Sequence, residues 1–163
     1  MKEFAIFVVL LALLLFTSGC IENAPENPSN TQNMQNKSVV VEVTRLEQIN
    51  TSLQKGPVLL ELGAGWCEDC QTLKPTLDKI ATEYEGRVTV MSIDVDKSPK
   101  LADYFFVNSL PDSSTIVGIE DNGYVYMKED GNVTKDRFKA RILGPQIKQV
   151  FEKVLDSALR ERK

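Results

Sequence analysis

The sequence of 163 residues contains no histidine, one tryptophan and three cysteines. The absence of histidine excludes Ser-His and Cys-His catalytic pairs, imidazole-ligated zinc and histidine-based pH switches. The chain also has no excess of positive charge, because it contains 19 Lys and Arg and 23 Asp and Glu, which gives a net charge of −4. This balance argues against nucleic acid as a partner. Chemistry in this chain must therefore come from carboxylates, lysines or cysteines.

The longest apolar run in the chain lies near its N-terminus. Residues 4–16 carry no polar side chain. This run is too short for the roughly 20 residues of a membrane-spanning helix but suits the hydrophobic region of a signal peptide. Lys2 supplies a positive charge before the run, and the small residues 17–19 lead directly into Cys20. The stretch resembles a lipoprotein lipobox with threonine in place of the usual leucine, which implies a signal peptide over residues 1–19 and a lipidated Cys20.

The alternative interpretation of residues 4–16 is an uncleaved N-terminal anchor.

Residues 20–37 follow and consist mostly of Asn, Pro, Ser and Gln. They bury too little apolar surface to fold and are predicted to form a flexible tether. Both interpretations attach the rest of the chain to a membrane. We therefore expect an extracytoplasmic protein anchored at the outer face of the cytoplasmic membrane.

Residues 38–161 have the length and composition of one globular domain. In the first half, their apolar patterns predict alternating strands and helices, which implies parallel strands joined by crossover helices. The expected strands are residues 39–43, 58–62 and 87–96, and the expected helices begin at a capping box of Thr44 and Glu47, after the turn 63–65, and at Ser98.

The second half of the domain predicts antiparallel pairing. Two strands, residues 115–119 and 124–127, flank an Asp-Asn-Gly turn, which is a strong hairpin signal. Residues 129–143 carry no clear pattern and give no assignment. An amphipathic helix that includes Ile147 on its apolar face begins near Pro145. The predicted fold class is therefore α/β, with a central mixed β-sheet flanked by helices on both faces.

A pair of cysteines lies between a predicted strand and a predicted helix. One helical turn separates Cys67 from Cys70 and brings their sulfurs close enough for a disulfide. Cys67 is expected at the helix N-terminus, where unpaired N–H groups and the helix dipole favour a thiolate. We therefore expect Cys67 to be the exposed nucleophile, and Cys70 to be shielded by the helix and to resolve mixed disulfides. The alternative is a static structural disulfide, but a bridge that closes so short a loop gains little stability.

The residues around this pair resemble the thioredoxin family. Trp66-Cys67-x-x-Cys70 matches the active-site motif of the family, and Pro75 matches the proline that kinks its active-site helix. The resemblance covers nearly all of residues 38–161. It implies a thioredoxin fold, a redox-active Cys67–Cys70 disulfide, and protein thiols or disulfides as substrates.

Glu61 extends the resemblance, because thioredoxins carry a buried Asp six residues before the first cysteine. A carboxylate within an apolar strand should have a raised pKa, so Glu61 is implied to accept and return the proton of Cys70. A solvated glutamate at the edge of the sheet is the alternative.

The family resemblance also implies a substrate surface. Leu110-Pro111 best matches the cis-proline that faces the disulfide, and the backbone of Leu110 would bind an extended substrate strand. Trp66 is implied as an apolar platform for partners, with a place in the core as the alternative. Gly63 replaces an aromatic residue, which predicts a reshaped surface beside Trp66. Residues 112–114 are polar where an apolar strand is usual, which predicts an insertion and a specialised substrate groove.

The dipeptide between the cysteines is Glu68-Asp69, where the family commonly has Gly-Pro. Two negative charges beside Cys67 disfavour its thiolate. We therefore expect a raised Cys67 pKa and a strongly reducing couple.

These observations predict a membrane-tethered, extracytoplasmic thiol–disulfide oxidoreductase of the protein-disulfide reductase or isomerase type. It would maintain the thiol redox state of exported proteins as a monomer without a metal or organic cofactor, and a membrane electron donor would supply it. The alternative is a thioredoxin-fold binding module without redox turnover. A metal site at Cys67 and Cys70 is disfavoured, because no histidine or second cysteine pair completes a tetrahedral ligand set.

Overall fold

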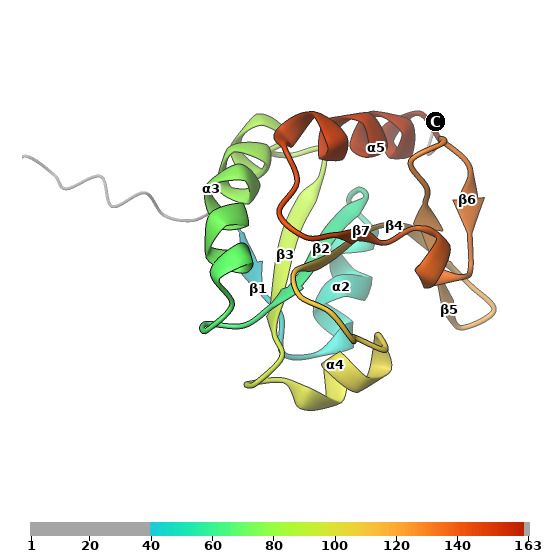
Figure 1. Cartoon of the computed structure of the whole chain (residues 1–163). Helices are drawn as coiled ribbons and strands as arrows, with labels where there is room; N and C mark the ends of the chain where they lie inside the picture. Colours follow the sequence, from blue (N-terminus) through green and yellow to red (C-terminus); the bar gives the residue numbers. More distant parts are fainter. Residues whose placement is uncertain (1–39, 162–163) are drawn as a thin grey trace, which may run out of the picture. The chain divides into compact units, whose positions relative to one another are not determined.

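A computed structural model describes residues 40–161. These residues form one compact unit (Figure 1). The predicted signal peptide, the lipidation site at Cys20 and the tether lie outside the described residues. Within residues 40–161, no helix has the length and apolar character needed to cross a membrane.

The described residues form a mixed seven-stranded sheet in the order β1-β3-β2-β4-β5-β6, with β7 paired to β4 (Figure 1). Strand β3 pairs in parallel with β1 and β2, and the remaining pairs are antiparallel. The strands are β1 (Val41–Glu42), β2 (Val58–Gly63), β3 (Thr89–Asp94), β4 (Asp112–Glu120), β5 (Gly123–Met127), β6 (Val133–Thr134) and β7 (Ile142–Leu143).

Helices cover both faces of this sheet, as the sequence predicts. The helices are α2 (Leu46–Leu53), α3 (Glu68–Glu83), α4 (Pro99–Tyr104) and α5 (Lys148–Glu161). Leu59 of β2 packs in a core with α3 and α5, whereas Leu60 and Leu62 pack in a second core with α2 and α4. Alternate side chains of a strand point to opposite faces, so β2 has no solvated face. Its near-continuous apolar sequence follows from this position.

Two helix starts differ from their predicted positions. Helix α2 begins one residue later than expected, with Arg45 as its N-cap. The capping side chain is therefore Gln48, whose Oε1 accepts hydrogen bonds from the N–H groups of Thr44 and Arg45, and not Glu47. Helix α5 begins at Lys148, which leaves Ile147 before the helix and exposed.

Strand β4 begins at Asp112, so the prediction that residues 112–114 depart from the strand is wrong. Asp112 and Ser113 pair with β2 on one side and β7 on the other, and Ser114 continues the ladder with β2. All three residues are buried, so polarity alone does not exclude a residue from a central strand. The predicted hairpin is confirmed, since Asp121 and Asn122 adopt the positive φ values of 49° and 62° that a type I′ turn requires.

The unassigned region contains the departure from a simple hairpin. After β5 the chain leaves β4, forms β6 and a short 3-10 helix (Arg137–Lys139), and returns to β4 as β7. We call residues 128–141 the excursion. It carries Arg137 and Arg141, and both of these side chains reach Asp112.

These two arginines and Asp112 form a buried ion cluster. Asp112 is fully buried, and each arginine side chain is only 7% exposed. Arg137 donates two hydrogen bonds to the Asp112 carboxylate, at 2.8 and 3.0 Å, and one to the carbonyl of Phe105 at 3.0 Å. Arg141 lies 2.8 Å from the same carboxylate and also donates to Asn108 at 2.9 Å. The cluster therefore joins the excursion to the loop between α4 and β4.

Replacing Asp112 should destabilise the protein strongly. D112N leaves two guanidinium charges buried without an anionic partner, and we expect a loss of about 3 to 5 kcal/mol in the free energy of unfolding. Urea unfolding of the oxidised protein at pH 7 measures this loss. The control is K139A, which breaks an exposed 3.7 Å pair with Asp136 and should cost less than about 1 kcal/mol. A D112N loss no larger than that of K139A would contradict this account of the cluster.

Candidate active site at the Cys67–Cys70 disulfide

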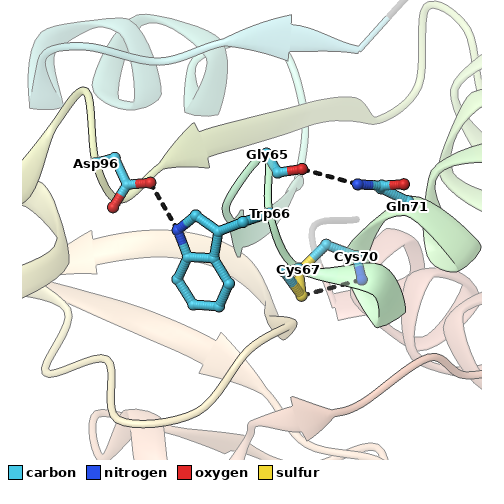
Figure 2. The surroundings of a disulfide bond; sticks show 6 residues. All are labelled: Gly65, Trp66, Cys67, Cys70, Gln71 and Asp96. Atoms are coloured by element: carbon cyan, nitrogen blue, oxygen red, sulfur yellow. Dashed lines mark hydrogen bonds between the residues drawn. A yellow bond between two sulfur atoms is a disulfide. The ribbon is translucent and has the colours of Figure 1, made fainter.

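The two cysteines lie where the turn after β2 leads into α3. Cys67 and Cys70 form a disulfide with their Cα atoms 5.2 Å apart. Cys67 is the N-cap of α3, and its Sγ accepts a hydrogen bond from the Cys70 N–H at 3.1 Å (Figure 2). Gln71 Nε2 donates to the Gly65 carbonyl at 2.8 Å and ties the preceding turn to the helix (Figure 2). The N–H donor and the helix N-terminus both stabilise negative charge on Cys67 when the disulfide opens.

The exposure of the two cysteines is the reverse of the prediction. Cys67 is only 7% exposed, whereas Cys70 is partly exposed. Cys70 lines a cavity of about 210 Å³ together with Glu61 and Gly63. Helix α3 therefore does not shield Cys70 fully in the disulfide form.

Trp66 lies on the surface, so its alternative place in the core is excluded. Its side chain is 68% exposed, and Nε1 donates a hydrogen bond to Asp96 Oδ2 at 2.8 Å (Figure 2). Glu68 and Asp69 are also exposed. An indole fixed by one hydrogen bond next to Cys67 presents an apolar face to solvent.

Glu61 is buried within β2, which excludes the alternative of a solvated edge residue. It is 6% exposed and pairs with Ser92 of β3 and Ser113 of β4. Desolvation raises its pKa from 4.5 to about 7, with a further increase from the negative charge of Asp112. Lys74 lowers the pKa in part, and the smallest contribution is a rise from Asp94. At neutral pH this carboxyl group can therefore both accept and release a proton.

Gly63 is buried beside Glu61 and Cys70, whereas the sequence predicted that its effect would be on the surface beside Trp66. A Cβ atom at this position would lie 3.2 Å from Cys70 Sγ and well under 3.0 Å from Glu61 Oε1. The carboxylate and the sulfur therefore both border the space that a side chain at residue 63 would fill. The sequence marked Gly63 as a missing aromatic residue but did not reveal which group uses the space.

The Leu110–Pro111 peptide is cis, as the family resemblance implies. Leu62 pairs with Asp112, so Pro111 lies beside the end of β2 that leads to the disulfide. The Pro111 carbonyl accepts a hydrogen bond from the Gly144 N–H at 3.0 Å, and the next residue belongs to the buried ion cluster. The loop that carries Pro111 is thus held from both sides.

Sequence reasoning missed the residues that hold this loop. Arg137 and Arg141 belong to the excursion, whose sequence shows no periodic pattern. The one available signal was Asp112 itself, because an acid next to a predicted buried strand requires a cationic partner. Ser113, which pairs with Glu61, was also missed, and its buried Oγ has no hydrogen-bond partner among the described residues. No group of three or more Cys, Asp or Glu within residues 40–161 is arranged to hold a metal ion.

A cysteine pair at the N-terminus of a helix, with a protonatable carboxyl group beside its second sulfur, defines the site of a thiol–disulfide oxidoreductase. Comparisons with known proteins agree. The thioredoxin family model matches residues 30–143. The chain is 28% identical over 120 residues to a thioredoxin of Staphylococcus aureus, a match that covers 74% of this chain and 98% of that protein.

Two further comparisons extend this result. Thioredoxin 1 of a Nostoc species is 36% identical over 55 residues, a match that covers 34% of this chain and only 51% of that protein. The structure of Trichomonas vaginalis thioredoxin superposes with a TM-score of 0.55 and 22% identity, covering 77% of this chain and 99% of that one. The chain belongs to the thioredoxin family, and it is a thiol–disulfide oxidoreductase that acts on protein thiols or disulfides.

The raised pKa of Glu61 predicts a pH-dependent stability. The folded protein holds the Glu61 proton up to about pH 7, whereas the unfolded chain releases it near pH 4.5, so ionisation of Glu61 destabilises the fold as the pH rises. E61Q cannot ionise. Relative to the parent, E61Q should therefore gain about 2 to 3 kcal/mol of unfolding free energy between pH 5 and pH 8.

Urea unfolding of both oxidised proteins at the two pH values measures this difference. The control is E85Q, which changes an exposed glutamate and should follow the parent at both pH values. If E61Q and E85Q show the same pH dependence, Glu61 is not the titrating group.

Proposed function

We propose that the protein is a membrane-tethered, extracytoplasmic reductase or isomerase of protein disulfides. The observation that carries the reductase chemistry is the Cys67–Cys70 pair at the N-terminus of α3, with Glu61 beside Cys70. The tether is supported by the sequence alone, through the apolar run at residues 4–16, Cys20 and the polar segment that follows. Exported proteins are accordingly the proposed substrates.

The reaction begins with the reduced protein. The Cys67 thiolate attacks one sulfur of a substrate disulfide, forms a mixed disulfide and expels the other substrate sulfur as a thiolate, which takes up a proton. Cys70 then transfers its proton to Glu61, and its thiolate attacks Cys67 Sγ. The Cys67–Cys70 disulfide forms, and the second substrate thiolate leaves and is protonated. Two electrons pass from the cysteine pair to the substrate.

Surrounding residues assist these steps. The Cys70 N–H bond to Cys67 Sγ favours the first thiolate, and exposed Trp66 offers an apolar contact to the substrate. The backbone at Leu110–Pro111 is the proposed binding edge for an extended substrate strand. The oxidised pair must then be reduced again by a dithiol donor, which we place in or across the membrane.

Loss of either cysteine tests turnover directly. C67S and the double variant C67S/C70S should lose all dithiothreitol-driven reduction of insulin disulfides, because no nucleophile remains at the helix N-terminus. C70S should accumulate a mixed disulfide with the substrate, visible on non-reducing gels, because it can attack but cannot resolve. If the parent never turns over, and if the parent and C67S/C70S bind disulfide substrates equally well, the protein is a binding module and not a reductase.

Replacement of Cys20 tests the tether. In bacterial cells that process lipoproteins, the full chain should incorporate labelled palmitate and partition into the detergent phase, whereas C20S should lose both properties. C67S is the matched control and should keep the label. If the parent itself remains in the membrane fraction without label, residues 4–16 form an uncleaved anchor, and lipidation is rejected.

A further inference from the structure

We propose that Gly63 is a positioning residue for the proton-transfer step, because its lack of a side chain lets Glu61 place its carboxylate beside Cys70 Sγ. This inference rests on the proposed function in one respect, namely that Glu61 accepts the proton of Cys70. It goes further, because it states that the residue at position 63 determines where the Glu61 carboxylate lies.

The strand geometry explains why these two residues interact. Residues two apart on a strand point to the same face, so Glu61 and Gly63 share the face of β2 that leads to Cys70. A Cβ atom on residue 63 would overlap Glu61 Oε1 and lie 3.2 Å from both Glu61 Cδ and Cys70 Sγ. The Gly63 backbone does not have a positive φ, so it does not itself require glycine. The overlap is with the end of the Glu61 side chain, and the 3.2 Å contact with Cys70 Sγ requires only a small shift.

A second observation shows where a displaced carboxylate would go. The cavity of about 210 Å³ beside Glu61 and Cys70 is also lined by Lys74 and Gln71. The charged groups that act on Glu61 are Asp112 of β4 and Asp94 of β3, which oppose its ionisation, and Lys74 of α3, which favours it. A carboxylate pushed away from residue 63 would move towards solvent and Lys74, where the charged form is favoured. It would then no longer border the Cys70 sulfur.

The two departures from the thioredoxin pattern therefore compensate each other. Glutamate is one methylene longer than the usual aspartate, and the extra reach occupies space that the usual aromatic residue at position 63 would fill. An aspartate at position 61 withdraws the carboxylate by one methylene, so it should tolerate a methyl group at position 63. This compensation predicts a strong energetic coupling between the two positions.

A double-mutant cycle of G63A, E61D and E61D/G63A tests the coupling, with G118A as the matched control. Gly118 of β4 has open space around its Cβ position and no positive φ, and it does not line the cavity beside Cys70, so its replacement should leave the site unchanged. The first readout is the rate at which Cys70 resolves a preformed mixed disulfide at pH 7. G63A should slow this step about tenfold when residue 61 is Glu and less than twofold when it is Asp, since a positioned base contributes at least this much.

The second readout does not depend on turnover. The carboxyl carbon of residue 61 can be titrated by NMR in the oxidised full chain. In the parent its midpoint should be about 7, and in G63A it should fall towards the ordinary glutamate value of 4.5. In G118A the residue 61 carboxyl group should titrate as it does in the parent.

Each outcome either supports or overturns the role of Gly63 in positioning the Glu61 carboxylate. Equal slowing by G63A in the parent and in the E61D background, or an unchanged Glu61 midpoint in G63A, would overturn the proposal. If G63A fails to fold, folding of E61D/G63A supports the steric coupling, and failure of both variants overturns it. If the parent itself shows no turnover, the proposed function fails, while the titration still tests the position of Glu61.

Discussion

The complete burial of β2 is the constraint on which the rest of the molecule depends. Both faces of this strand pack against helices, so nearly all of its side chains are apolar. Glu61 is the exception, and desolvation raises the pKa of its carboxyl group to about 7. The same strand then delivers Cys67 to the N-terminus of α3. A group that exchanges protons at neutral pH and a cysteine pair are thereby held at the same end of β2.

Two buried carboxyl groups on neighbouring strands have opposite electrostatic environments. Asp112 of β4 is ion-paired with Arg137 and Arg141 and is part of the framework. Glu61 of β2 has no arginine partner of this kind within residues 40–161, and the charge of Asp112 further opposes its ionisation. Carboxylates whose environments differ in this way take different roles. The buried ion cluster holds the loop of Pro111 in place, while Glu61 remains available for proton exchange.

The sequence predicted the fold class and the core of the site because these follow from local patterns. An apolar run marks β2, helical spacing marks α3, and the Asp-Asn-Gly turn marks the β4–β5 hairpin. The start of β4 could not be predicted, because the burial of Asp112 depends on arginines 25 and 29 residues away. The greater exposure of Cys70 and the role of Gly63 likewise depend on space between elements, which a sequence pattern does not encode.

The reduction potential of the Cys67–Cys70 couple tests the central claim most directly. The protein would be equilibrated at pH 7 with dithiothreitol and glutathione buffers, and its single tryptophan, Trp66, would report the redox state by fluorescence. The account predicts a reducing couple, with a potential of about −270 mV or lower, as suits a reductase with acidic residues between its cysteines. A potential near about −120 mV, typical of a disulfide donor, or cysteines that never exchange with the buffer, would contradict it.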